Sequence, residues 1–282
     1  MTSRDWQADR RAVFDRDDRA CRHCEEPGDA ADPTDLRTHP VGAVPLEGTV
    51  HESSLATVCT DCFETLQFAR DSPDSTVESV SSGDLFRLVR ETTRVQGGAI
   101  ADVASFASLA TSLPTAIAEA RTDADAAADS GSAFESAVDE TAAEYRDGRR
   151  EALLALDVAD ARLERVRAVD ETAFDADVRS SLSTVVETAT DLQSTLREAV
   201  ALAESVPAGL ERCHGCFEPI EGDVCSTCGL EALETADWRT EDGDIAFERL
   251  FSSVNDSLQG ASTTTETLTD RTMTLASQLT ES

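Results

Sequence analysis

The chain has 282 residues, of which 40% are hydrophobic and only 5% are aromatic. This length allows one or two compact domains, but so few aromatic side chains exclude one large aromatic core. We therefore expect a mainly α-helical protein whose helices bury apolar stripes. Its 56 acidic residues outnumber 24 basic residues, which are all arginine, and the formal net charge is −32. Such a charge ordinarily argues against binding to nucleic acid.

The acidic, lysine-free surface resembles that of proteins from salt-accumulating extreme halophiles. In molar salt the Debye length is about 3 Å, so repulsion from a phosphate backbone nearly disappears. The same salt also removes most of the counterion release that drives DNA binding. Charge therefore neither excludes nor supports a nucleic-acid partner. Residues 1–24, with six arginines and five aspartates, are the least acidic stretch, and their arginines either contact phosphates or form a solvated helix surface.

All eight cysteines occur in Cys-x-x-Cys pairs. The first eleven residues contain no apolar signal region, and no apolar run approaches the roughly 18 residues of a membrane span. We therefore expect a cytoplasmic protein without a membrane partner. In that compartment thiols stay reduced, and paired cysteines more often bind metal than form disulfides.

The predicted N-terminal unit covers residues 1–70. Its elements are a helix over residues 4–20 with Trp6, Val13 and Phe14 as its apolar side, strands over 36–39 and 55–58, and a helix over 60–70. Two cysteine pairs lie within it, separated by 34 residues. Four thiolates on two tight turns suit a closed tetrahedral zinc site. The predicted ligands of this first structural Zn²⁺ are Cys21, Cys24, Cys59 and Cys62.

Three segments of this unit resemble HNH endonucleases: residues 13–18 (VFDRDD), 36–40 (LRTHP) and 54–63 (SLATVCTDCF). The resemblance covers about a quarter of the chain. It implies a ββα unit that holds one divalent ion, Mg²⁺ or Mn²⁺, beside a general-base histidine, with a four-cysteine zinc bracing the unit.

Matched position by position, the resemblance places His39 on the catalytic base. Thr38 then stands where the family has a metal-binding Asp, Ser54 where it has the Asn that orients the base, and Phe63 where it has the last metal-binding His. A neutral hydroxyl and a phenyl ring are poor ligands for a hard cation. Without the metal, a general base contributes only about 10²–10⁴-fold. Candidate replacement ligands are Glu47, His51, Asp61 and Glu64.

Residues 71–83 read as a linker, and residues 84–208 have helical periodicity. We expect a helix over 84–112 that is weakened at Gly97-Gly98 and ended by Pro114, an Ala-rich helix over 114–128, and a break at residues 129–131. Two long helices follow, with a reversal near Asp170. The second carries a heptad seam of about four repeats. The seam packs either inside a helical hairpin or bundle, or in a coiled-coil homodimer.

Residues 209–232 resemble a small zinc ribbon, with eight residues between its two cysteine pairs. So short a segment has almost no core, and the metal must supply folding free energy on the order of 10 kcal/mol. A redox dithiol is the less favoured alternative. Residues 233–282 form a helical segment, with expected interruptions at Gly260 and residues 263–265. The predicted ligands of the second structural Zn²⁺ are Cys213, Cys216, Cys225 and Cys228.

Three functions fit these features. The favoured one is a catalytically degenerate HNH-like zinc protein that acts as an adaptor for DNA, RNA or protein. The second is an active metal-dependent endonuclease with His39 as the base. The third is a coiled-coil scaffold in which the zincs are purely structural.

Overall fold

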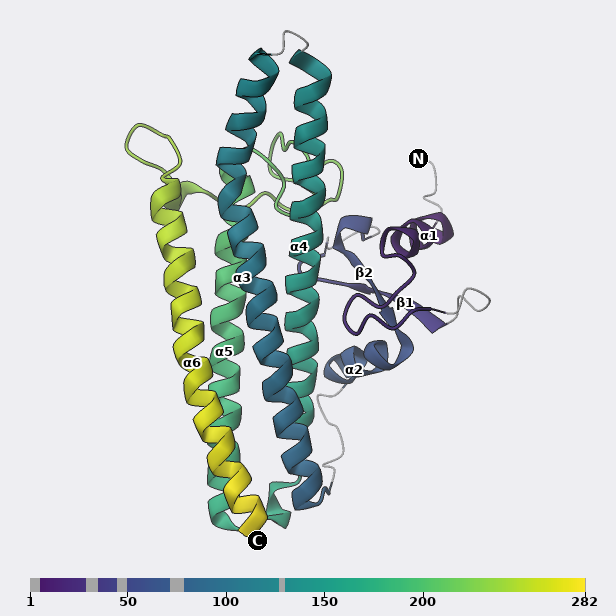
Figure 1. Ribbon diagram of the computed structural model, residues 1–282, viewed down its shortest axis with the longest axis vertical. Helices are drawn as coiled ribbons and strands as arrows, with labels where there is room; N and C mark the ends of the chain where they lie inside the picture. The colour runs from purple at the N-terminus through teal and green to yellow at the C-terminus, as the bar shows by residue number, and fades with distance from the viewer. Residues whose placement is uncertain (1–5, 29–34, 45–49, 72–78, 127–129, 282) are drawn as a thin grey trace.

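The computed structural model describes residues 6–28, 35–44, 50–71, 79–126 and 130–281. It is mainly helical, with a long bundle of four helices and a smaller N-terminal unit at its side (Figure 1). The N-terminal unit consists of α1 (Trp6–Arg16), β1 (Leu36–Pro40), the turn η2 (Glu52–Ser54), β2 (Leu55–Cys59) and α2 (Thr60–Asp71). The bundle consists of α3 (Ser82–Ala126), α4 (Ser130–Arg167), α5 (Ala176–Gly209) and α6 (Phe247–Glu281), with the turns η3 (Glu171–Ala173) and η4 (Ala236–Trp238).

The heptad seam of α5 is buried inside the single chain. Its nine members each have 4% or less of their surface exposed, because α3, α4 and α6 pack around α5. The structure therefore uses this seam as the core of a bundle. The seam residues are Val178, Leu182, Val185, Ala189, Leu192, Leu196, Ala199, Ala203 and Val206.

The predicted reversal near Asp170 is confirmed. The Asp170 carboxylate accepts hydrogen bonds from the backbone and hydroxyl of Thr172, and these bonds close the turn η3. Asp175 then caps α5 by accepting from the backbone N–H groups of Asp177 and Val178. A capping carboxylate satisfies N–H groups that have no partner within the helix, so the chain turns back in few residues.

The predicted helix breaks at Pro114 and Gly260 are wrong, because α3 and α6 run through these positions. α3 also continues through Gly97-Gly98, where we expected a weakened helix. Proline in a helix interior costs about 3 kcal/mol. Buried residues before Pro114, such as Ala110 and Leu113, keep α3 packed on the bundle and outweigh that cost. The expected interruption at residues 263–265 is also absent.

In that part of α6, each threonine hydroxyl donates to the carbonyl four residues earlier. The three bonds, from Thr263, Thr264 and Thr265, are 3.2, 3.0 and 2.7 Å long. The polar side chains are thus satisfied within the helix and do not compete with its backbone hydrogen bonds. Ala261, next to this run, is fully buried and fixes the helix on the bundle.

The N-terminal unit contains the predicted pair of strands followed by a helix. β1 and β2 are antiparallel, with His39 opposite Ala56. α1 ends earlier than expected, since Asp18 and Arg19 adopt left-handed backbone conformations with φ of 53° and 52°. Val13 of α1 is buried, whereas the side chain of Trp6 lies outside the described residues. α2 and β2 contact α4, so the unit packs on one side of the bundle.

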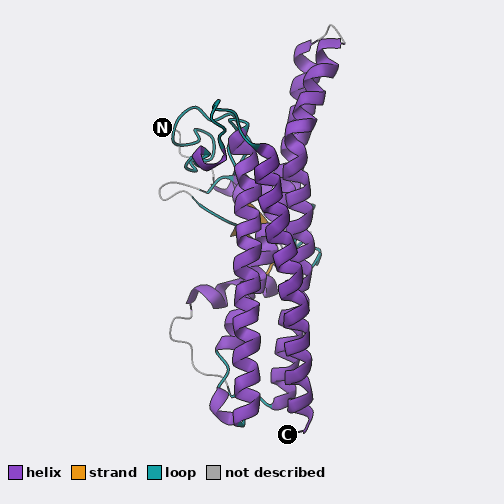
Figure 2. Cartoon of the chain, turned by 90° about the vertical axis from the view of Figure 1, so that its left-hand side faces the viewer, coloured by secondary structure: helices purple, strands orange, loops and turns teal. Residues whose placement is uncertain are grey.

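Near the α3–α4 turn, the two helices extend as a pair beyond the ends of α5 and α6 (Figure 2). We call this pair the helical arm and assign to it residues 114–126 of α3 and 130–141 of α4. Only Ala124 and Val138 are buried among its described side chains. The arm is therefore held by contacts between two helices instead of four.

One helix in the described part of the chain, α3, is long and apolar enough to cross a membrane by length and composition. Its most apolar 18-residue window is 28% buried in the structure. Core helices of soluble bundles meet the same criterion, and α3 packs against α4, α5 and α6.

Candidate metal centres

The first cysteine set joins the loop after α1 to the start of α2. The ligand atoms of Cys21, Cys24, Cys59 and Cys62 all lie within 4.8 Å of one another. Cys21 is buried and Cys24 is exposed. The backbone N–H of Arg22 donates to the carbonyl of Thr57 at 2.8 Å, which ties the first cysteine pair to β2.

The second set is more enclosed, since all four cysteines, Cys213, Cys216, Cys225 and Cys228, are buried. The Sγ atoms of Cys213 and Cys228 are 3.4 Å apart, and those of Cys216 and Cys225 are 3.5 Å apart. The backbone N–H of Gly215 donates to the Cys213 sulfur at 3.4 Å. Besides these cysteines, this small core contains only Leu230, with Ile220 packed on it. Such a core is too small to fix the segment without a bound ion.

Three of the four cysteine pairs adopt the same turn. In each, the first cysteine donates its N–H to the carbonyl five residues later and accepts at its carbonyl from the N–H four residues later. The residue at that fourth position has a left-handed φ, +61° at Glu25, +66° at Phe217 and +77° at Gly229. This geometry points both sulfurs of a pair to one side. The fourth pair, Cys59 and Cys62, uses the junction between β2 and α2 instead.

Crowding of the sulfurs separates their pKa values. The hydrogen bond from Cys62 lowers the pKa of Cys21 to about 4, and the pKa of Cys62 rises because its proton is held by Cys21. At the second set, hydrogen bonds from Cys216 and Cys228 lower the pKa of Cys213, while the pKa of Cys228 rises to about 12 through its bond to Cys213. A divalent cation at the centre would stabilise all four thiolates together. Four soft sulfur donors in a closed set suit structural zinc.

The second set is anchored to α4. The hydroxyl of Tyr145 donates to the carbonyl of His214 at 2.8 Å, and the guanidinium of Arg146 donates to the carbonyl of Cys216 at 3.2 Å. The ring of Phe217 packs 5.2 Å from that of Tyr145. His214 is buried, and this burial lowers its pKa. Its imidazole therefore packs beside the sulfur ligands as a neutral group.

The proposed base, His39, lies in the interface between β1 and α4. Its residue surface is 4% exposed, and its Nε2 lies 3.1 Å from Oδ2 of Asp157. Asp157 in turn pairs with Arg197 of α5 at 3.2 Å. A cavity of about 440 Å³ adjoins these groups, and Asp160 and Glu204 also line it. His39 therefore faces three carboxylates and one guanidinium.

The candidate replacement ligands that the structure describes, His51, Asp61 and Glu64, do not assemble a third metal site. Nδ1 of His51 pairs with the Ser53 hydroxyl at 2.9 Å, and Asp61 and Glu64 lie exposed on α2. Glu47 lies outside the described residues. Within the ranges that the structure describes, the two cysteine sets are the sole groups of three or more metal-binding side chains close enough to share an ion.

Sequence reasoning missed Asp157, Arg197 and Tyr145, which connect these units to the bundle. They lie on helices far from the units in sequence, and helical periodicity gives no signal for such contacts.

No protein-family model matches the chain, and no curated protein or solved structure is significantly similar to it. The likeness to HNH endonucleases therefore depends on the quoted residues alone.

Proposed function

We propose that this chain is a zinc-binding adaptor in which an HNH-like unit has lost its catalytic role. The observation that carries the proposal is the pair of four-cysteine sets, each with its ligand atoms within 4.8 Å. Two structural zincs would rigidify two loop-rich units and fix them on one helical bundle. Loops held in this way suit recognition of a nucleic acid or a protein.

The surroundings of His39 argue against phosphodiester cleavage. Metal-dependent nucleases use a cation to stabilise the charge on the phosphate and on the leaving oxygen. Thr38 and Phe63 stand at the positions that would hold that cation. The imidazole of His39 contacts Asp157 and is almost fully covered by α4. The carboxylates of Asp160 and Glu204, which line the adjoining cavity, are paired with Arg197 and Arg149, so neither arginine offers an uncompensated charge to a phosphate group.

The positions of the two units support an adaptor. The N-terminal unit contacts α4 through His39 and Asp157, and also through an ion pair between Arg22 and Glu151. The second zinc unit contacts the same helix at Tyr145 and Arg146, about one and a half turns before Glu151 and about three turns before Asp157. α4 therefore fixes the spacing between the two units, so a partner that binds both would meet a preformed surface.

Metal analysis and a nuclease assay test the proposal together. We expect two zinc ions per chain by elemental mass spectrometry, with the zinc content falling to one in Cys225→Ser. We expect no cleavage of plasmid DNA or RNA with Mg²⁺ or Mn²⁺, at low salt or in multimolar KCl. Chains without zinc would refute the proposal. Metal-dependent cleavage that disappears in His39→Ala would establish the nuclease alternative instead.

A further inference from the structure

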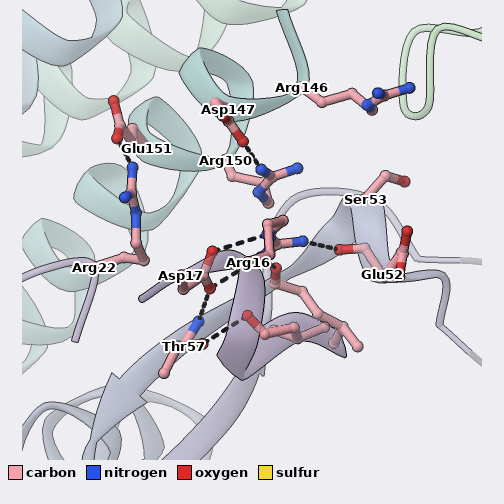
Figure 3. Close-up of polar contacts among 12 residues, drawn as sticks. Arg16, Asp17, Arg22, Glu52, Ser53, Thr57, Arg146, Asp147, Arg150 and Glu151 are labelled. Carbon is pink, nitrogen blue, oxygen red and sulfur yellow. Dashed lines mark hydrogen bonds and ion pairs between the residues drawn. The ribbon is translucent and has the colours of Figure 1, made fainter. Parts of the chain in front are cut away.

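A cleft of about 360 Å³ separates the two zinc units. The N-terminal unit contributes Arg16 and residues 51–53, α4 contributes Arg146 and Arg150, and the second zinc unit contributes Thr227 with residues 216 and 218. Figure 3 shows the guanidinium groups of Arg16 and Arg150 facing one another, with Arg146 farther along α4. Three arginines thus line one cleft of a chain with a net charge of −32, together with the carboxylates of Asp147, Glu52 and Glu218.

The three arginines differ in how many of their N–H groups already form hydrogen bonds or ion pairs within the protein. Arg16 donates to both oxygens of Asp17, at 2.8 and 2.9 Å, and to the carbonyls of Glu52 and Leu55. Its N–H groups are therefore largely engaged, and Asp17 compensates most of its charge. Arg146 donates to the carbonyl of Cys216 at 3.2 Å and forms no ion pair within the described residues.

Arg150 is the most constrained of the three. Only 6% of its surface is exposed, and its carboxylate partner Asp147, one turn earlier on α4, is itself half exposed. Burial, together with the charges of Arg16, Arg22 and Arg146, lowers the pKa of Arg150 to about 9 against the opposing charge of Asp17. A buried cation among like charges is costly unless an anion compensates it.

A phosphate group meets these requirements. Arginine forks bind phosphate oxygens through two parallel charge-assisted hydrogen bonds. Arg146 and Arg150 are one turn apart on α4, so both side chains project to the same side of the helix. The hydroxyl of Thr227 provides a further donor on the opposite wall. The cleft volume is within the range of small-ligand sites.

We propose that this cleft binds a phosphate group, carried by a free nucleotide or by a nucleic-acid strand, through Arg146 and Arg150. The carboxylates of Glu52, Asp147 and Glu218 also line the cleft, so a bound phosphate must lie on the arginine side of it. This phosphate site rests on the proposed function in one respect, because the cleft has both of its outer walls only when the two zinc units are folded. A bound phosphate would then contact both units and α4 at once.

Calorimetry on the zinc-loaded full chain tests the cleft with three probes at 0.2 M KCl: sodium pyrophosphate, ATP without Mg²⁺, and a 12-nucleotide single strand. We expect pyrophosphate binding and competition by pyrophosphate with whichever larger probe binds. Binding of ATP but not of the strand identifies a nucleotide. Tighter binding of the strand, with affinity that falls more steeply with salt, identifies a polymer backbone.

The variants Arg146→Gln and Arg150→Gln should each weaken pyrophosphate binding by about tenfold or more, since each removes charge-assisted hydrogen bonds. Arg94→Gln is the matched control, because Arg94 is an exposed arginine on α3, which does not line the cleft. Zinc content is measured in every variant, and Arg146→Gln provides the decisive result if Arg150→Gln does not fold.

Unchanged affinity for pyrophosphate in Arg146→Gln would refute the proposed phosphate site and leave the adaptor proposal standing. Failure of a chain with two zincs to bind any probe would have the same consequence. Phosphate binding by a chain without zinc, if Arg146→Gln weakens it, would contradict the adaptor proposal and the need for zinc in the cleft walls, but would support the phosphate site itself.

Discussion

Removing the charge of Glu204 should destabilise the whole bundle. The Arg149 side chain is 1% exposed, and its Nε donates to the Glu204 carboxylate at 2.6 Å. Burial lowers the pKa of the Arg149 guanidinium, but the charge and hydrogen bond of Glu204, together with Tyr145 and Cys213, outweigh burial and leave that pKa above its ordinary value. Glu204→Gln keeps the shape of the side chain and leaves a buried, uncompensated cation. Breaking such a pair on one side costs about 3–5 kcal/mol.

That cost is a large fraction of a typical stability of about 5–15 kcal/mol. The assay is guanidinium unfolding followed by far-ultraviolet circular dichroism in zinc-containing buffer. Glu198→Gln on the exposed side of α5 is the matched control and should stay within about 0.5 kcal/mol of the unmodified chain. The double variant Arg149→Met/Glu204→Leu should recover most of the loss, because it removes both charges. If Glu204→Gln is as stable as Glu198→Gln, the pair does not stabilise the fold and the reasoning fails.

Three further predictions follow from other parts of the structure. Leu196→Ala in the α5 seam should lower the free energy of unfolding by about 2–5 kcal/mol, whereas Met273→Ala, at a residue 60% exposed, should change it by less than about 0.5 kcal/mol in the same unfolding assay. Tyr145→Phe leaves the buried carbonyl of His214 without its donor and should cost about 1–3 kcal/mol by thermal unfolding; unchanged stability would show that water replaces the hydroxyl. Chelation with EDTA should release zinc and unfold the segment around Cys225 while helical circular dichroism persists, and simultaneous loss of both signals would contradict the independence of bundle and zinc unit.

The sequence predicted the metal sets and the order of the elements because both depend on local patterns. Cys-x-x-Cys spacing already specifies a turn with two sulfurs on one side, and the seam of α5 follows a seven-residue period over its whole length. The two strands, the helix after Cys59 and the reversal at Asp170 were likewise predictable from turn and capping residues.

Helix lengths were less predictable, because tertiary packing decides them. Gly97 and Gly98 each weaken an isolated helix by roughly 1 kcal/mol. Buried Gln96 and Ala99 on either side keep α3 in place, and Gln96 also donates to the carbonyl of Ala189 on α5 at 2.9 Å. These contacts join residues far apart in the sequence, so the pattern of neighbouring residues does not predict them.

The environment of His39 was equally inaccessible to sequence reasoning. Its partner Asp157 lies 118 positions later, on a helix whose pattern indicates only an apolar stripe. The sequence could place His39 on a strand of a ββα unit, but only the packing of that unit on α4 covers the imidazole.

The helical arm has a consequence for local opening. In the arm, α3 and α4 pack on each other without α5 and α6 and bury few side chains. The free energy of the opening that lets amide hydrogens of the arm exchange with solvent should therefore be well below that of global unfolding. Fluctuations that separate the tip of α3 from that of α4 can therefore occur while both cysteine sets and the four-helix section remain closed.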